Sequence, residues 1–216
     1  MPIDRRSIIK AVDEAKKGTK KRGFTQSINL ILTLKDIDLK RPENRINELI
    51  ELPHSSKPDV KIAVFATGDL ALRAEKAKAG IVLGRADIER FANDKKGAKK
   101  LVEGTDFFLA ETSLMATVGK VLGTVLGPRG KMPTPVPPTA PIETIIDRHR
   151  RSLRVRLRDQ PTAQISVGTD EMSDDVLADN IQAVFALFER KLAKGSKNIW
   201  KIYVKTTMGP PTKVEF

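Results

Sequence analysis

The 216-residue chain has no cysteine and only two histidines, His54 and His149. Without thiols it can form neither a disulfide framework nor a thiolate metal site, and two imidazoles are too few for most zinc chemistry. No apolar run approaches the roughly 20 residues that a membrane-spanning helix needs, and no signal-peptide pattern opens the sequence. We therefore expect a soluble cytoplasmic protein that binds no metal, no cofactor and no membrane.

Motifs of the common enzyme classes are absent as well. There is no cysteine nucleophile, no HExxH pair and no GxSxG turn. The glycine-rich residues 123–133 do not form a Walker loop, because no Ser or Thr follows Lys131 and the segment comes after a predicted helix. Residues 67–69, Thr-Gly-Asp, are too short for a dinucleotide fingerprint. We interpret both segments as turns and predict that the protein is not an enzyme, with a nucleotide-dependent enzyme on the central region as the disfavoured alternative.

Acidic residues are outnumbered: 39 Lys and Arg stand against 27 Asp and Glu, a formal net charge of +12. Such a surplus favours a polyanionic partner, because neutralising phosphates releases condensed counterions. The charge does not locate the contact, since residues 61–150 hold 15 basic and 10 acidic side chains and the rest of the chain holds 24 and 17. Nucleic acid is the first partner to test, and a basic scaffold for acidic proteins is the alternative.

Two kinds of strand pattern divide the chain. Near both ends apolar and polar residues alternate, as in strands with one buried face. The central region has short, wholly apolar strands separated by helical patterns, which is typical of a parallel sheet covered on both faces. We expect alternating strands at residues 24–34, 153–158, 163–167 and 199–204, an extended piece at 48–53, and helices at 4–17 and 173–194. In the central region we expect strands at 61–66, 81–83 and 106–110, and helices from about 68, at 86–93 and at 113–126.

One domain made of both chain ends, with a second domain inserted, explains the two patterns economically. The turn-forming residues 54–59 indicate a first linker. The proline-rich residues 132–141 indicate an extended second linker, because proline cannot continue a helix. The predicted fold class is a discontinuous α+β domain with an inserted three-layer α/β domain.

A basic tract at the end of the first predicted helix is the first candidate binding site. Phosphate contacts beside a stackable ring fit RNA recognition, although lysines that complement a helix dipole explain the tract equally well. The residues are Lys16, Lys17, Lys20, Lys21 and Arg22, followed by Phe24.

Three alternating arginines, Arg154, Arg156 and Arg158, form the second candidate. On a strand they share one face at a spacing of roughly 6 to 7 Å, close to the pitch of a phosphate backbone. An ordinary exposed sheet face paired with acidic neighbours is the alternative.

The last candidate is the C-terminal segment at residues 206–211, Thr-Thr-Met-Gly-Pro-Pro. Two hydroxyls and a glycine that exposes the backbone can contact ribose hydroxyls and phosphates without adding charge. By composition alone, a strand end followed by a turn is the better interpretation.

Five segments follow one another along nearly the whole chain. They are Arg-Gly-Phe-Thr-Gln-Ser at residues 22–27, Glu-Leu-Pro-His at 51–54, the loop at 126–133, Leu-Ala-Asp-Asn-Ile at 177–181 and Val-Lys-Thr-Thr-Met-Gly-Pro at 204–210. Each alone is a weak signal, but jointly and in this order they are highly specific, and they resemble the L-one family of ribosomal proteins in its archaeal form.

The resemblance implies an RNA-binding domain at residues 1–60 and 152–216, and an inserted Rossmann-like domain at residues 61–151. It implies a constituent of the large ribosomal subunit that binds the stalk of the large-subunit rRNA. Family members assist the release of deacylated tRNA from the exit site, and many repress translation of their own mRNA by binding its leader or coding region. We expect a monomer when the protein is free.

The resemblance also implies the RNA contacts, residue by residue. The main surface combines Phe24, Gln26, Ser27 and Asn29 with Lys205, Thr206, Thr207, Met208 and Gly209. Neighbouring contacts are expected from Gln164, Ser166 and Gly168. Possible phosphate contacts are Lys20, Lys21, Arg22, Arg154, Arg156 and Arg158.

Overall fold

The computed structural model describes residues 3–20, 22–41 and 44–215, and the chain forms two compact units. Unit 1 combines residues 1–57 with residues 151–216, and unit 2 consists of residues 58–150. The chain therefore passes from one unit to the other twice, at residues 57–58 and 150–151.

Unit 1 is built on an antiparallel sheet whose strands come from both ends of the chain. Their buried residues alternate with partly exposed ones, so the sheet has one covered and one open face. The predicted alternation is thus confirmed. The strand order is β10-β9-β1-β8, with β1 at Ser27–Leu34, β8 at Thr162–Thr169, β9 at Ile199–Thr206 and β10 at Thr212–Val214.

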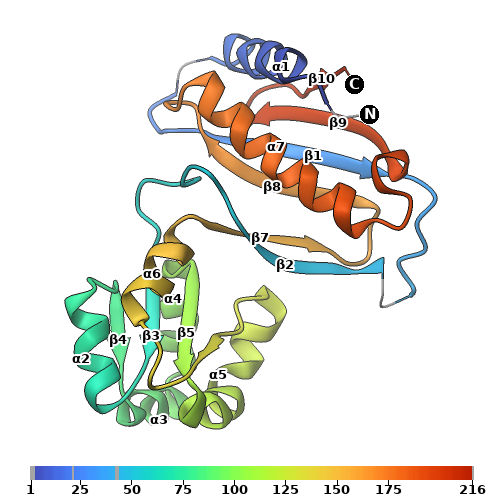
Figure 1. The fold of residues 1–216 in the computed structure, drawn as a ribbon. Helices are drawn as coiled ribbons and strands as arrows, with labels where there is room; N and C mark the ends of the chain where they lie inside the picture. Colours follow the sequence, from blue (N-terminus) through green and yellow to red (C-terminus); the bar gives the residue numbers. More distant parts are fainter. Residues whose placement is uncertain (1–2, 21, 42–43, 216) are drawn as a thin grey trace. The chain divides into compact units, whose positions relative to one another are not determined.

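Two amphipathic helices pack against the covered face. Helix α1 (Arg5–Lys17) begins at Asp4, whose carboxylate accepts a hydrogen bond from the backbone N–H of Arg6. Helix α7 (Asp174–Lys191) lies across the strands in Figure 1 and carries Asp174 and Asp175 in its first turn. Both helices contribute to one apolar core with β1, β8 and β9. A short 3-10 turn, η3 (Gly195–Asn198), follows α7.

A two-stranded antiparallel ribbon completes unit 1. Strands β2 (Ile46–Glu51) and β7 (Ser152–Leu157) pair along their whole length. Their inward side chains, which include Ile46, Val155 and Leu157, join the core of unit 1.

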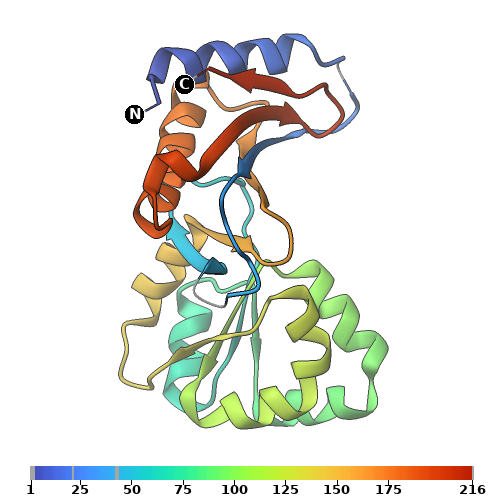
Figure 2. The same ribbon diagram turned by 90° about the vertical axis from the view of Figure 1, so that its right-hand side faces the viewer.

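Unit 2 is a three-layer α/β unit with a parallel sheet of order β4-β3-β5-β6 (Figure 2). Alternate residues of the fully buried strand β3 point to opposite faces: Ala63 and Phe65 pack on one side, Ile62 and Val64 on the other. The strands are β3 (Ile62–Phe65), β4 (Ile81–Leu83), β5 (Phe107–Glu111) and β6 (Thr134–Val136). Helices α3 (Arg85–Asn93), α4 (Lys95–Gly104) and α5 (Met115–Arg129) cover one face, and α2 (Gly68–Lys76) and α6 (Ile142–Arg150) cover the other. A 3-10 turn, η2 (Thr112–Leu114), precedes α5.

The predicted proline-rich second linker is wrong. Residues 134–136 form β6, an edge strand where proline's missing N–H costs only one possible bond, and α6 follows before the chain leaves unit 2. The guanidinium of Arg73 donates hydrogen bonds to the carbonyls of Pro138 and Ala140 and so holds the segment against α2.

The interpretation of the glycine-rich residues 123–133 as a turn is wrong for their first part. Helix α5 continues to Arg129, with Pro128 in its last turn. Pro128 cannot donate the backbone bond of that turn, and the helix ends one residue later at Arg129. Gly130, at a positive φ of 65°, then ends the helix, and its N–H donates to the carbonyl of Gly127. Helices α4 and α6 and strand β10 were not predicted.

Candidate nucleic-acid interface

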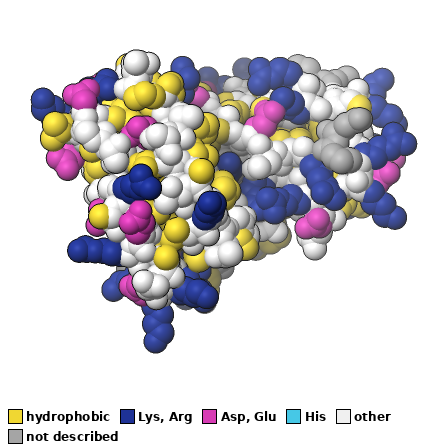
Figure 3. Space-filling model, turned by 90° about the horizontal axis from the view of Figure 1, so that it is seen from below, with side chains coloured by type: hydrophobic (Ala, Val, Ile, Leu, Met, Phe, Trp, Pro, Cys, Tyr) yellow, Lys and Arg dark blue, Asp and Glu magenta, His cyan; other side chains and the backbone are white. Residues whose placement is uncertain are grey.

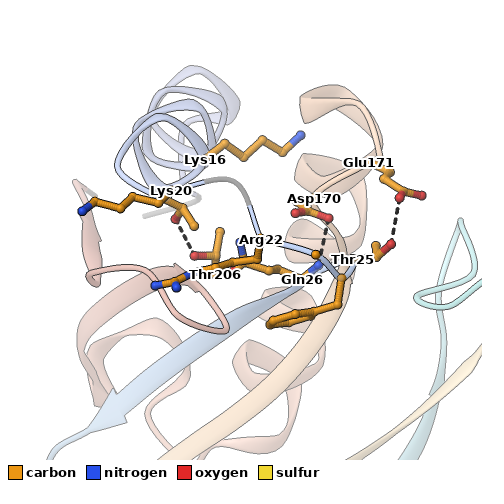
Figure 4. A pocket seen from close by; sticks show the side chains of 11 residues that line it. Lys16, Lys20, Arg22, Thr25, Gln26, Asp170, Glu171 and Thr206 are labelled. Atoms are coloured by element: carbon orange, nitrogen blue, oxygen red, sulfur yellow. Dashed lines mark hydrogen bonds between the residues drawn. The ribbon is translucent and has the colours of Figure 1, made fainter.

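A pocket of about 530 Å³ opens in unit 1 where α1, the start of β1 and the turn between β8 and α7 meet. Basic, acidic and hydroxyl side chains surround it, and its one large apolar side chain is Phe24. Figure 4 shows Lys20 on the side of the pocket away from Asp170 and Glu171. The lining residues are Lys16, Thr19, Lys20, Arg22, Gly23, Phe24, Thr25, Gln26, Asp170, Glu171 and Thr206.

Gln26 is the centre of the hydrogen bonds at this end of the sheet. Its side chain is buried, and its Oε1 accepts from the backbone N–H of Met208 at 3.1 Å. Its backbone N–H donates to Oδ1 of Asp170 at 3.0 Å, and its carbonyl accepts from the N–H of Asp170 at 2.9 Å. Gln26 therefore fixes the C-terminal segment and the β8–α7 turn to the start of β1, and its role is to position its neighbours.

At the next position Ser27 pairs with Thr207, whose side-chain hydroxyl makes the hydrogen bonds. The N–H of Ser27 donates to Oγ1 of Thr207 at 3.1 Å, and Oγ1 of Thr207 donates back to the Ser27 carbonyl at 3.3 Å. Thr207 itself is exposed. The C-terminal segment is thus held to β1 at two successive positions, which fixes its backbone in advance of any ligand.

A pair of threonine hydroxyls lies on the other side of the segment. Oγ1 of Thr19 donates to the carbonyl of Ala15 at 2.8 Å, so Thr206 is the donor in the 2.6 Å bond between the two hydroxyls. A Cβ at Gly209 would lie 2.2 Å from both hydroxyl oxygens. Only glycine fits at position 209 without displacing this pair, and both Thr206 and Gly209 serve the shape of the surface.

Two large apolar side chains remain in solvent beside these bonds. Phe24 is 53% exposed and Met208 is 59% exposed, although Phe24 lies only two residues before the buried Gln26 and the N–H of Met208 donates to the Gln26 side chain. Rigidly held, exposed apolar side chains mark interaction sites when polar groups surround them. These two are the best candidates for direct contact with the faces of bases and riboses.

The predicted basic tract separates into two groups. Lys16 donates to the carboxylate of Asp174 at 2.6 Å, and Lys17 pairs with Asp13, whose hydrogen bond raises the pKa of Lys17. Lys20 and Arg22 line the pocket, and Lys21 lies outside the described residues. Lys16 also lines the pocket, but it is paired with Asp174, and Lys17 is paired with Asp13, so Lys20 and Arg22 are the cations of the tract with no acidic partner among the described residues.

The open face of the sheet carries three rows of side chains across its strands. Asn29 of β1 lies between Ser166 and Lys205, and the next rows place Ile31 between Gln164 and Tyr203, and Thr33 between Thr162 and Lys201. None of these described side chains is acidic. Four predicted contacts, Asn29, Gln164, Ser166 and Lys205, therefore share one face. Gly168 does not, because it is buried and a Cβ there would lie 2.4 Å from Cδ2 of Leu177.

The predicted arginine row lies elsewhere in unit 1, on the β2–β7 ribbon. Arg154 and Arg156 are partly buried and lie opposite Leu49 and Asn47, while Arg158 is exposed beyond the end of the strand. Burial, together with the charges of Arg156 and Arg158, lowers the pKa of Arg154. Cations that crowd one another in this way favour an anionic ligand, but they do not line the pocket.

Sequence reasoning missed Thr19, Asp170 and Glu171. Glu171 accepts a hydrogen bond from Oγ1 of Thr25 at 2.8 Å, in the same turn as Asp170. The partners of all three lie 144 to 187 positions away along the chain. The acidic pair Asp170 and Glu171 was the one signal available in the sequence, because side chains in the turn before a helix are accessible to hydrogen-bond donors.

A nucleotide-dependent enzyme would bind its ligand at the carboxyl edge of the parallel sheet of unit 2. Oε2 of Glu111 accepts from the N–H and Oγ1 of Thr67 at 3.0 and 2.9 Å, and Oε1 accepts from Ser113 at 2.7 Å. The hydrogen bonds from Ser113 and Thr67 lower the pKa of Glu111 against the opposing effect of burial. A carboxylate thus occupies the position before α2 where a phosphate would be held, which argues against a nucleotide site.

The described residues contain no cluster of three or more metal-ligating side chains, and none of their helices is long and apolar enough to cross a membrane. On the face drawn in Figure 3, Lys and Arg side chains spread across the surface with acidic side chains among them. Charge alone therefore does not single out a site, in agreement with the count along the sequence.

Comparison with known proteins decides the family. The model of the ribosomal protein L1p/L10e family matches residues 14–210. The chain belongs to this family. It is 46% identical to the large ribosomal subunit protein uL1 of Methanocella arvoryzae over 210 residues, 97% of this chain and 99% of the relative. It is also 46% identical to the uL1 protein of Pyrococcus horikoshii over 216 residues, 100% of this chain and 98% of the relative.

Both organisms are archaea, which confirms the archaeal form of the resemblance. Membership of a ribosomal protein family assigns the chain a structural role, and it is not an enzyme. The matched region includes the start of β1, the β8–α7 turn and the segment up to Pro210, so it covers the whole candidate interface.

Proposed function

We propose that the protein is a constituent of the large ribosomal subunit that binds the stalk of the large-subunit rRNA through unit 1. The observation that carries the proposal is the pair of bonds from the C-terminal segment to β1, Met208 to Gln26 and Thr207 to Ser27. They hold an exposed, largely uncharged surface in one shape. The uL1 relatives, which are large-subunit proteins by name, match this chain over nearly its full length.

Recognition on this surface depends on shape. Met208 and Phe24 offer apolar area to bases and riboses, and the exposed Thr207 and the backbone around Gly209 offer polar groups to 2′-hydroxyls and phosphates. Because Gln26, Thr206 and Gly209 fix these groups beforehand, little conformational entropy is lost on binding.

Affinity comes partly from the surrounding cations. Lys20 and Arg22 line the pocket, and Lys205 stands on the open face next to Asn29. Each contact between such a cation and a phosphate strengthens binding to any RNA and weakens as salt is added. The specific part of the affinity resides in the uncharged groups.

The same surface supports two further roles. An mRNA leader or coding region that folds like the stalk would bind to it, so free protein would repress its own translation. A stalk that carries the protein would assist the release of deacylated tRNA from the exit site. Both roles follow from the family resemblance, and the cytoplasmic ribosome is where they take place.

A competition experiment tests the shared surface. Labelled stalk RNA is bound to the protein and challenged with RNA from its own mRNA, with an unrelated hairpin of equal length as the control. We expect the mRNA to displace the stalk RNA and the hairpin to displace little. An mRNA that binds without displacing the stalk RNA would contradict the shared surface. For the tRNA role, ribosomes reconstituted without the protein should release deacylated tRNA more slowly.

A further inference from the structure

Trp200, the only tryptophan of the chain, is 54% exposed at the start of β9. Both its neighbours along the strand are more buried, Ile199 at 3% exposure and Lys201 at an intermediate value. The cause is an irregularity in the pairing with β1: the described register steps from Thr33↔Lys201 to Leu34↔Ile199. Trp200 has no β1 partner in the described register, and its side chain is exposed at a position that strict alternation would bury.

One cation lies over the exposed ring. Nζ of Lys201 is 4.1 Å from the ring centroid, a cation–π contact that leaves much of the ring open to solvent. The backbone of Lys35 is held to Asn198, two residues before Trp200: its N–H donates to the carbonyl of Asn198 at 2.7 Å, and its carbonyl accepts from Nδ2 of Asn198 at 3.0 Å. Lys197 is exposed one residue before Asn198.

Two acidic residues lie in the adjoining segments. Asp36 follows Lys35, and its carboxylate lies 3.9 Å from Nζ of Lys194, at the limit of an ion pair between two exposed side chains. Glu215 follows Val214, which pairs with Ile202 of β9. Lysines outnumber them, with Lys35, Lys194, Lys197 and Lys201 in the same segments. That combination of an exposed aromatic ring and lysines suits a single-stranded nucleic acid, whose bases stack while its phosphates meet the cations.

The open face of the sheet links Trp200 to the candidate interface. Thr207 lies seven residues after Trp200, a path of about 23 Å in extended conformation. Along that path Lys201, Tyr203 and Lys205 present their side chains on the open face. A few nucleotides bound to the segment around Thr207 would reach Trp200 over a surface that carries cations and an aromatic ring.

We propose that Trp200 is a stacking platform for an unpaired base of the RNA bound at the main interface, at the far end of β9. The occupant is RNA, because the exposed ring lies at the end of a face that carries Lys201 and Lys205, and these cations complement phosphates. The inference rests on the proposed function, since it extends the same RNA footprint along the sheet.

The fluorescence of Trp200 tests the inference directly, because no other tryptophan contributes. Full-length protein is titrated with a stalk RNA fragment, and binding is followed in parallel by the anisotropy of labelled RNA. We expect the fluorescence to be quenched with the same midpoint as the anisotropy change, since a stacked base quenches the indole. Trp200→Leu should weaken binding about tenfold, and Trp200→Phe should retain most of the affinity.

A matched variant and a trimmed RNA complete the design. Leu72→Ala, which alters an equally exposed apolar side chain on α2 of unit 2, should bind like the wild type. Removing the unpaired nucleotides from the fragment should weaken the wild type and leave Trp200→Leu unchanged, a result that a general folding defect would not produce.

The outcomes separate the two claims. A wild type that binds the stalk RNA with unchanged fluorescence, together with full affinity in Trp200→Leu, overturns the stacking platform and leaves the main interface standing. The ring would then serve a protein partner. A wild type that does not prefer the stalk RNA overturns the proposed function and the platform with it.

Discussion

The backbone N–H of Met208 donates to Oε1 of Gln26 across 3.1 Å, although 182 positions separate the two residues in the chain. One of the partners is buried and the other is 59% exposed. The bond therefore connects the interior of unit 1 to the surface that we assign to RNA. It explains how an exposed methionine is held in one place by a buried side chain.

Gln26→Ala removes this bond and leaves Met208 exposed. We expect RNA affinity to fall about tenfold, because the segment must then be ordered on binding, while the melting temperature drops by only a few degrees. Isothermal titration and thermal unfolding measure the two effects. Gln182→Ala on α7, outside the pocket lining, is the control and should retain affinity. An unchanged affinity in Gln26→Ala would mean that Gln26 does not position the segment around Met208 for RNA binding.

Gly209→Ala tests the close approach of the two threonine hydroxyls. A Cβ at position 209 would lie 2.2 Å from both oxygens, so the segment must shift, and we expect a loss of about 1–3 kcal/mol in the free energy of unfolding together with weaker RNA binding. Gly23→Ala is the matched control, because a Cβ at Gly23 meets nothing within 4 Å. Equal behaviour of the two variants in denaturant unfolding would refute the role of Gly209.

Met208→Ala separates contact from folding. The side chain is 59% exposed, so its removal should leave the melting temperature unchanged and lower RNA affinity about tenfold through lost apolar contact. Met132→Ala in unit 2, where the side chain is 39% exposed, should change neither quantity. Wild-type affinity in Met208→Ala would mean that the RNA lies elsewhere.

His149 gives unit 2 a dependence on pH. The side chain is 4% exposed, and its Nδ1 lies 2.8 Å from the carbonyl oxygen of Ile145. The centroids of its ring and of the Phe107 ring are 5.8 Å apart in an edge-to-face arrangement. Burial lowers the pKa of His149 from its ordinary value of 6.5, with a further contribution from Arg148. Below about pH 6.5 the unfolded chain therefore binds more protons, and the stability of unit 2 falls as the pH is lowered toward the folded pKa.

The measurement is thermal unfolding between pH 7.5 and pH 5 for the wild type, for His149→Leu and for His54→Gln. The wild type and His54→Gln, which alters a half-exposed imidazole, should lose stability on acidification. His149→Leu should lose less. A pH dependence that His149→Leu leaves unchanged would assign it to other groups.

The fold class was accessible from the sequence because burial leaves a periodic trace. Strand β1 buries every second side chain, β8 and β9 do so over most of their length, and β3 buries all four of its residues, so the alternating and continuous patterns identified the two kinds of sheet. The proline-rich segment misled, because the rule that proline breaks helices does not distinguish a linker from an edge strand. Residues 134–136 pair with β5 through a sheet edge that local sequence does not reveal.

The candidate site was accessible only in part. The resemblance named the segment around Thr207 together with Asn29, Gln164 and Lys205, and the pairing of β1 with β8 and β9 brings these last three onto one face. Whether a residue contacts solvent or supports its neighbours depends on packing across the chain. Gln26 and Thr206 are both nearly fully buried, and the bond from Thr206 to Thr19 spans 187 positions. No local pattern encodes such a pair.

The central claim is that shape, and not charge alone, selects the RNA. The most direct test measures the affinity of the purified protein for a stalk fragment of the large-subunit rRNA and for an unrelated hairpin of equal length, across a series of salt concentrations. The account predicts tight binding to the stalk fragment that survives moderate salt, and weaker binding to the hairpin that salt abolishes. Equal and equally salt-sensitive binding to both RNAs would contradict it.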